Sequence, residues 1–120
     1  MPAVHFPGVV PDLTGFVPKD HYAWLPPGTE LSAARQIDPA FARVAAWARE
    51  KAPGHEIHIG EFGVYVAADA GSKRRYVAAI RAAAERDGFG WAVWDYNDSF
   101  GVRDRRGRPT PILAGLFPRP

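Results

Sequence analysis

The pattern of apolar and polar positions divides the 120-residue chain near residue 38. Seven of the 12 prolines lie among the first 39 residues, and residues 7–28 follow neither the period of a strand nor that of a helix. We therefore predict an irregular, loop-rich segment over residues 1–37, with one short strand at residues 3–6. A structureless segment of this length is unusual in a self-contained domain and is more typical of the decorated end of a larger scaffold.

Helical spacing begins at residue 38. Asp38 followed by Pro39 favours a helix start, because the Asp side chain can accept from free amides and Pro fits the first turn. Gly54 marks the end of this helix. Its predicted apolar stripe is Phe41, Val44, Ala45 and Ala48.

Two further helices are predicted downstream. Ser72 is expected to cap the second helix, which ends at Gly88, and Thr110 opens a short third helix that runs to Phe117. The apolar stripe of the second helix is Tyr76, Val77, Ile80 and Ala84.

Two short segments between these helices predict β-strands. Residues 56–62 alternate apolar and polar side chains, and residues 89–95 are apolar on both faces. The second pattern is typical of a strand buried from both sides in a parallel sheet. The order helix, strand, helix, strand, helix indicates the α/β class, with parallel strands joined by crossovers.

Two strands are too few for an independent sheet. Three helices cannot cover both faces and both edges of such a pair, and so narrow a sheet is not expected to be stable alone. We therefore expect residues 38–120 to belong to a larger closed or doubly wound sheet whose other strands this sequence does not contain. The uncovered strands also predict self-association.

Composition and charge exclude several classes of function. The chain has 15 Lys and Arg against 13 Asp and Glu, a net charge of +2, so we expect no nucleic-acid partner. It has no Cys, which excludes thiolate metal sites and a cysteine nucleophile. His55 and His58 would point to opposite faces of a strand, so no metal site is expected either. No apolar run approaches the roughly 20 residues of a membrane span, so no membrane partner is expected.

The first candidate for chemistry is Glu61, at the end of the first predicted strand. Gly60 and Gly63 lie on either side of it, and glycines let backbone or ligand approach closely. In α/β barrels, catalytic residues gather at the C-terminal ends of the strands. On the residues alone, the commoner explanation of Glu61 is a surface carboxylate beside turn glycines.

The second candidate is Trp94, at the end of the second predicted strand. By strand alternation it shares a face with the small residues Gly90 and Ala92. It could be a core residue, or a platform on which the apolar face of a pyranose stacks. The polar residues that would then meet the sugar hydroxyls are Asp95, Asn97 and Asp98.

Together these two segments carry a resemblance to a known family. Residues 57–65, with the sequence IHIGEFGVY, and residues 90–102, with the sequence GWAVWDYNDSFGV, resemble the end of a glycoside hydrolase family 5 (cellulase-type) barrel. The resemblance extends over residues 38–117 and includes the closing segment 107–113. It implies that residues 38–120 are the C-terminal part of a (β/α)8 TIM barrel, an incomplete barrel that contains its last helix, strand, helix, strand and helix.

The resemblance also implies a reaction. Glu61 matches the catalytic nucleophile, and Trp94 matches the aromatic residue that floors the subsite at the cleaved bond. The substrate would be a β-linked oligo- or polysaccharide, hydrolysed with retention through a glycosyl-enzyme, and no cofactor is needed. Enzymes of this family are usually secreted or periplasmic, which is the location expected for the complete protein.

The second carboxyl that this reaction requires has no counterpart in the sequence. In the family it follows an Asn on the fourth strand, whereas the only Asn here is Asn97, which Asp98 follows. The segment around His5 resembles the element after the family's sixth strand, with Pro7 where the family has a Tyr. His5 and Asn97 are therefore further substrate-binding candidates, and we expect the chain alone to be inactive.

Two other readings remain open on the sequence. A non-catalytic carbohydrate-binding remnant would keep Trp94 and its polar neighbours but would not need Glu61. An interaction module would use the apolar surface that a partial barrel leaves uncovered.

Overall fold

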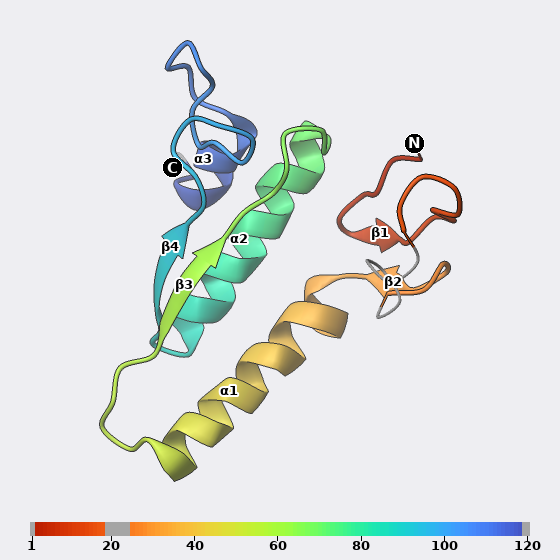
Figure 1. Ribbon diagram of the computed structural model, residues 1–120. Coiled ribbons are helices and arrows are strands. Elements are labelled where there is room, and N and C mark those ends of the chain that lie inside the picture. Colours follow the sequence, from red (N-terminus) through yellow and green to blue (C-terminus); the bar gives the residue numbers. More distant parts are fainter. Residues whose placement is uncertain (1, 19–24, 119–120) are drawn as a thin grey trace.

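The computed structural model describes residues 2–18 and 25–118 of the chain (Figure 1). Its elements are β1 (Gly8–Val9), β2 (Glu30–Leu31), the π-helical turn η2 (Ala33–Ile37), α1 (Asp38–Lys51), β3 (His58–Phe62), α2 (Ala70–Arg86), β4 (Gly90–Val93) and α3 (Pro111–Leu116). The strands form two separate two-stranded sheets, so the described residues make an α/β fragment without a closed barrel. Within these ranges, no helix has the length and apolar character required to cross a membrane.

The parallel pairing of β3 with β4 is the central feature of the fold, and it confirms the predicted parallel strands. His58 lies opposite Gly90 and Ile59 opposite Trp91, but the next pair is Phe62 with Val93. Two residues of β3 therefore oppose a single residue of β4, which is the arrangement of a β-bulge.

The two faces of this sheet have different surroundings. Side chains on one face pack into the clusters formed with α1, α2 and α3; these are Ile59, Phe62, Trp91 and Val93. The residues of the opposite face are exposed, and we call this the open face: His58, Gly60, Glu61, Gly90 and Ala92. The prediction that the second strand is buried from both sides is therefore wrong for this chain, because nothing in the described residues covers the open face.

The three helices lie on the covered side, with α2 between α1 and α3 (Figure 1). The largest fully buried side chains are Val77 of α2 and Ile112 and Leu116 of α3, so the α2–α3 contact is the best-packed part of the core. Gly115 allows this close approach, because a Cβ at this position would overlap the carbonyl oxygen of Arg74. The predicted stripe of α2 is confirmed, with Tyr76 half-buried at its margin.

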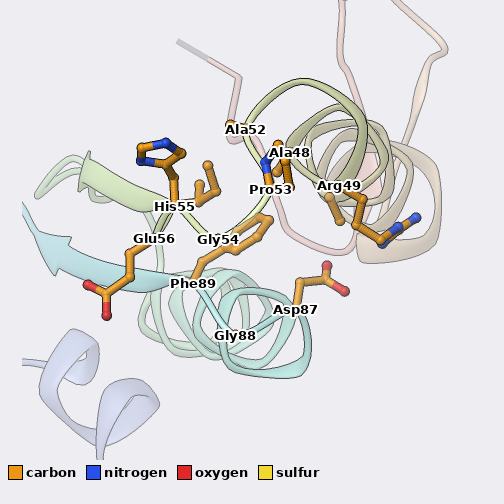
Figure 2. A pocket seen from close by; sticks show the side chains of 12 residues that line it. Ala48, Arg49, Ala52, Pro53, Gly54, His55, Glu56, Asp87, Gly88 and Phe89 are labelled. Atoms are coloured by element: carbon orange, nitrogen blue, oxygen red, sulfur yellow. The ribbon is translucent and has the colours of Figure 1, made fainter.

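Helix α1 packs more loosely than α2. Ala45 is buried and Phe41 half-buried, but Val44 is 41% exposed, so its prediction as a core residue is wrong. The C-terminal end of α1, the segment 53–57 and residues 87–89 line an open cavity of about 530 Å³ (Figure 2). This cavity lies at the N-terminal ends of β3 and β4.

The helix starts differ from the sequence predictions at two positions. Asp38 is not a cap, because the π-helical turn leads directly into α1, and its carboxylate instead accepts from Arg86 at 2.8 Å. Asp69, rather than Ser72, caps α2, and its side chain accepts from the Ser72 amide. The cap by Thr110 at α3 is confirmed.

The N-terminal segment is more ordered than its composition indicates. The strand predicted at residues 3–6 is absent there, and a short strand lies instead at Gly8–Val9, antiparallel to β2. The pairing joins Gly8 with Leu31 and Val9 with Glu30, and in the turn before β2 the Thr29 hydroxyl donates to the carbonyl of Pro26. Residues 19–24 of this segment lie outside the described residues.

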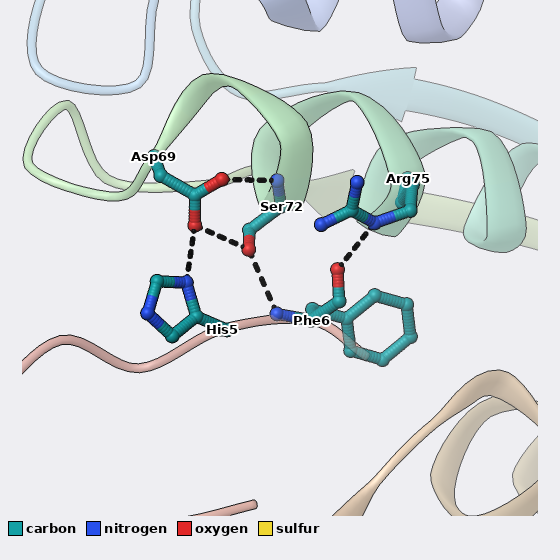
Figure 3. Close-up of polar contacts among 5 residues, drawn as sticks. All are labelled: His5, Phe6, Asp69, Ser72 and Arg75. Atoms are coloured by element: carbon teal, nitrogen blue, oxygen red, sulfur yellow. Dashed lines mark hydrogen bonds and ion pairs between the residues drawn. The ribbon is translucent and has the colours of Figure 1, made fainter. Parts of the chain in front are cut away.

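Residues 5 and 6 attach this segment to the first turn of α2 (Figure 3). His5 Nδ1 lies 2.9 Å from Asp69 Oδ2, the Phe6 amide donates to Ser72 Oγ at 2.8 Å, and Arg75 Nε donates to the Phe6 carbonyl at 2.8 Å. The Ser72 hydroxyl in turn donates to Asp69 Oδ2. We call these five residues the N-terminal clamp.

The α2–α3 contact generates a prediction about Gly115. Replacing Gly115 with Ala places a methyl group against Arg74 and Val77, so we expect the free energy of unfolding in urea to fall by about 1–3 kcal/mol. Gly71→Ala is the matched control, because a Cβ at Gly71 would meet only the movable end of Arg75 and should be neutral or stabilising by up to about 1 kcal/mol. Equal effects of the two substitutions would contradict this packing.

The N-terminal clamp generates a prediction about acid stability. Hydrogen bonds from the Ser72 side chain and backbone, and then from His5, hold the pKa of Asp69 well below its usual value. Because the pKa is lower in the folded than in the unfolded chain, the stabilisation is complete above about pH 4 and is lost as the pH falls toward the folded value. Asp69→Asn should therefore lower the melting temperature at about pH 7, and the difference from the wild type should shrink below about pH 4.

Circular dichroism melts across this pH range measure the effect. Glu50→Gln is the control, since Glu50 is exposed and pairs with the adjacent Lys51. A difference between Asp69→Asn and wild type that is the same at every pH would show that the carboxylate charge does not contribute.

Candidate active site

Glu61 lies on the bulge of β3. Ile59 and Phe62 both face the helices, so Gly60 and Glu61 are the two residues that oppose Ala92 of β4. Both are exposed on the open face. Bulges of this kind often re-aim a side chain next to an active site, and here the bulge presents the Glu61 carboxylate where the strand ends.

Trp94 follows β4 immediately and is 55% exposed. Its amide donates to the Phe62 carbonyl at 2.7 Å, which extends the contact between the two strand ends. Val93 packs on the helix side, so continued alternation along the strand predicts that Trp94 faces the open side with Gly90 and Ala92. The structure therefore places Glu61 and Trp94 at neighbouring ends of two parallel strands, with both side chains exposed.

The loops that follow the two strands are joined to each other. A Cβ on Gly63 would overlap the Trp94 carbonyl oxygen, so the backbones approach as closely as glycine allows. The Val66 amide donates to the Ser99 carbonyl at 2.6 Å, and the Tyr65 ring meets Phe100 edge-on with centroids 5.5 Å apart. These contacts hold together the two loops that follow Glu61 and Trp94.

Two of the acids predicted as sugar-contacting neighbours have other partners. Both oxygens of Asp95 accept from backbone amides, Asp98 at 2.8 Å and Phe100 at 3.4 Å, so Asp95 shapes the loop that Trp94 begins. The Asp98 carboxylate lies 3.0 Å from Arg105. Sequence reasoning missed this organising role, although an Asp directly before a loop rich in small polar residues is a known turn signal.

The two remaining binding candidates lie in different places. Asn97 is exposed in the loop after β4, at the same end of the sheet as Glu61 and Trp94. His5 belongs to the N-terminal clamp and lines a largely apolar cavity of about 520 Å³ on the helix side, where Gly63 and Tyr65 also lie. The structure thus groups Asn97 with the acid and the indole, and it assigns His5 a hydrogen-bonded partner, Asp69.

Other features of the described residues do not add to this site. The cavity of Figure 2 is at the opposite ends of the strands, where barrels carry stability rather than chemistry. Residues 2–18 and 25–118 contain no group of three or more His, Cys, Asp or Glu side chains placed to hold a metal ion. The groups at and after the ends of β3 and β4 include the Glu61 carboxylate and three exposed aromatic rings, those of Tyr65, Trp94 and Tyr96.

Comparison with solved structures relates this arrangement to known enzymes. A hyperthermophilic endo-β-1,4-glucanase in complex with substrate matches 70% of this chain at 31% identity, with a TM-score of 0.62. The cellulose synthase subunit Z of Clostridioides difficile matches 67% at 33% identity and a TM-score of 0.60. Cel5A of Thermotoga maritima in complex with cellobiose matches 69% at 25% identity and a TM-score of 0.62.

These matches cover only part of each enzyme. The chain spans 27% of the length of each of these three structures. No protein-family model matches the sequence, and no curated protein does. The resemblance to the endoglucanases of glycoside hydrolase family 5 is confirmed at the level of structure, and the chain corresponds to a fragment, about a quarter, of such an enzyme.

Proposed function

We propose that this chain is the C-terminal part of a cellulase-type glycoside hydrolase barrel, in which Glu61 is the nucleophile of a retaining reaction. The observation that carries the proposal is the bulge in β3, which presents Glu61 on the open face beside the strand end that leads to Trp94. The endoglucanase likeness of the same segment supports it. The substrate would be a polysaccharide with β-glycosidic bonds.

The proposed chemistry follows from what a glycosidic bond needs. The Glu61 carboxylate would attack the anomeric carbon as the bond to the leaving oxygen breaks, forming a covalent glycosyl-enzyme, and its charge would stabilise the oxocarbenium-like transition state. A second carboxyl about 5–5.5 Å away must protonate the leaving oxygen and then deprotonate the water that releases the sugar. Trp94 would hold the sugar ring by stacking against its apolar face.

The proposed second carboxyl is not among the acids of the described loops. Asp95 and Asp98, the carboxylates that follow Trp94, are occupied by backbone amides and by Arg105. Asp69 is held by Ser72 and His5 at the start of α2. We therefore propose that this chain alone binds sugar but does not cleave it.

Sugar binding depends on Trp94 under this proposal. Trp94→Ala should weaken binding of cellotetraose by tenfold or more in a calorimetric titration, since burial of an aromatic side chain is worth about 1.5–3 kcal/mol. Trp47→Ala is the matched control, because Trp47 of α1 is 54% exposed, almost the same as Trp94, and lies away from the open face. An equal loss in both variants, or no loss in either, would refute Trp94 as a sugar platform.

Absence of turnover in the isolated chain is a separate prediction. The purified chain should release no reducing ends from carboxymethylcellulose or mannan, and the Glu61→Gln variant should be indistinguishable from it. Turnover that disappears in Glu61→Gln would show that this chain contains a complete catalytic pair. If the wild-type chain and Glu61→Gln bind cellotetraose equally, and the wild-type chain shows no turnover even when a second carboxyl is supplied, the carbohydrate-binding alternative is favoured.

A further inference from the structure

We propose that the hairpin between β4 and α3 recognises acidic groups on the ligand of the proposed sugar site, so that this ligand is a β-linked glycan that carries carboxylates. The hairpin comprises residues 102–110, and we call it the arginine hairpin. The inference rests on the proposed function for sugar binding at Trp94. It goes further by naming the charged substituent that the glycan must carry.

The arginine hairpin is joined to the loop that Trp94 begins. The Arg103 amide donates to the Tyr96 carbonyl at 2.9 Å, and Arg103 and Pro109 form the antiparallel bridge that closes the hairpin. Figure 1 shows this segment projecting beyond the C-terminal ends of β3 and β4, which is the end of the sheet where Trp94 follows β4. The arginine hairpin therefore lies beside the proposed sugar site.

The arginine hairpin concentrates the positive charge of the protein. Residues 103–108 contain four Arg and one Asp, a formal charge of +3, whereas the whole chain carries +2. The remainder of the chain therefore has an excess of one negative charge. Because the field of the protein follows this distribution, the attraction of an anionic ligand is directed to the hairpin.

Asp104 fixes the shape of the hairpin turn. Its carboxylate accepts from the Arg106 amide at 2.8 Å, from the Arg108 amide at 3.0 Å and from Arg108 Nε at 2.7 Å. These hydrogen bonds, first among them the one from the Arg108 amide, hold the pKa of Asp104 below its usual value, so the carboxylate is ionised at neutral pH. Gly107 completes the turn with a φ of +75°, and its carbonyl accepts from the Arg103 guanidinium at 2.8 Å. The turn is thus formed before a ligand binds, which lowers the entropy cost of binding.

Two guanidinium groups remain at the tip of the hairpin. The Arg105 side chain is 85% exposed and contacts Asp98 at 3.0 Å through one nitrogen, so its other donors face water. The Arg106 side chain is exposed and has no hydrogen bond or ion pair with any residue that the structure describes. A guanidinium presents paired N–H donors that match a carboxylate, and those of Arg106 are available for it.

A carboxylated glycan is the ligand that uses both parts of this surface. A neutral glucan can stack on Trp94 but offers no anion to Arg106, and a polyanion without sugar rings offers nothing to the indole. A glycan that contains uronic acids carries an apolar ring face and an anion on one chain. The exposed indole and the charge of the arginine hairpin therefore together favour an acidic glycan.

Two soluble glucans separate the effect of charge from that of the sugar. Carboxymethylcellulose and hydroxyethylcellulose have the same β-linked backbone, and only the first carries carboxylates. In calorimetric titrations of the full 120-residue chain at low salt, carboxymethylcellulose should bind about threefold more tightly, which is the size expected of one exposed charge pair. High salt should remove this preference.

Arg106→Gln tests the proposed contact. It should bring the ratio of the two affinities close to one, because it removes the guanidinium whose donors have no partner. Arg43→Gln is the matched control, since it removes the same charge from an exposed position on α1 and should leave the ratio unchanged. Neither side chain has a hydrogen-bonded partner among the described residues, so both variants should melt like the wild type.

Asp104→Ala distinguishes a shaped site from net charge. The substitution raises the net charge of the chain from +2 to +3 but removes the acceptor that holds the turn. The preference for carboxymethylcellulose should therefore be lost, as in Arg106→Gln. A stronger preference would indicate attraction by net charge alone and would overturn the inference.

The remaining outcomes also decide between the proposals. Equal binding of the two glucans by the wild type, or an equal loss of preference in Arg106→Gln and Arg43→Gln, would overturn the inference. Poly-L-glutamate that binds as tightly as carboxymethylcellulose would overturn it too, by showing that the hairpin binds any polyanion. If Trp94→Ala leaves cellotetraose binding unchanged while the Arg106-dependent preference persists, the arginine hairpin stands as a carboxylate site and the sugar platform of the proposed function is refuted.

Discussion

The packing of α2 across β3 and β4 holds the two strands parallel and in register. Val77 and Ala84 are fully buried beneath the strands, and Ile112 and Leu116 of α3 extend the same core. A two-stranded sheet has little stability of its own, so its register here is set by the side chains that face the helices. Because Ile59 and Phe62 must both reach those helices, the two residues between them are forced out as a bulge. The position of Glu61 is therefore a consequence of core packing.

Sequence patterns predicted those parts of the fold whose burial is periodic. The sequence predicted the apolar stripe of α2, the two parallel strands and the Thr110 cap, because each depends on residues close together in the chain. The caps predicted at Asp38 and Ser72 were wrong. Both are residue types that favour caps, but in each case helical structure begins before that residue. Val44 has the correct spacing for a core position, but the part of α1 that packs against the rest of the fold is too narrow to bury it.

The residues of the candidate site could be predicted from the sequence, but the bulge and the hydrogen bonds that position them could not. Glu61 and Trp94 stand at strand ends beside small residues, which is visible in the sequence. The bulge was not visible, because Ile59 and Phe62 depart from strict alternation by one residue and only their common packing reveals it. The roles of Asp95 and Asp69 were likewise hidden, since a carboxylate next to a predicted site looks the same whether it meets a ligand or a backbone amide.

Both the stability of the fold and the proposed chemistry require the open face to be covered. A carboxylate in contact with water is well solvated, and its attraction to a developing positive charge is weak at high dielectric. Enclosure of the face would remove water, strengthen that attraction and bring the second carboxyl within reach. The same enclosure would bury the small residues around Gly90 and pair the free strand edges, which is the apolar burial and hydrogen bonding that this narrow sheet lacks. Covering the open face would therefore stabilise the fold, and by this reasoning the proposed hydrolysis would also require that face to be covered.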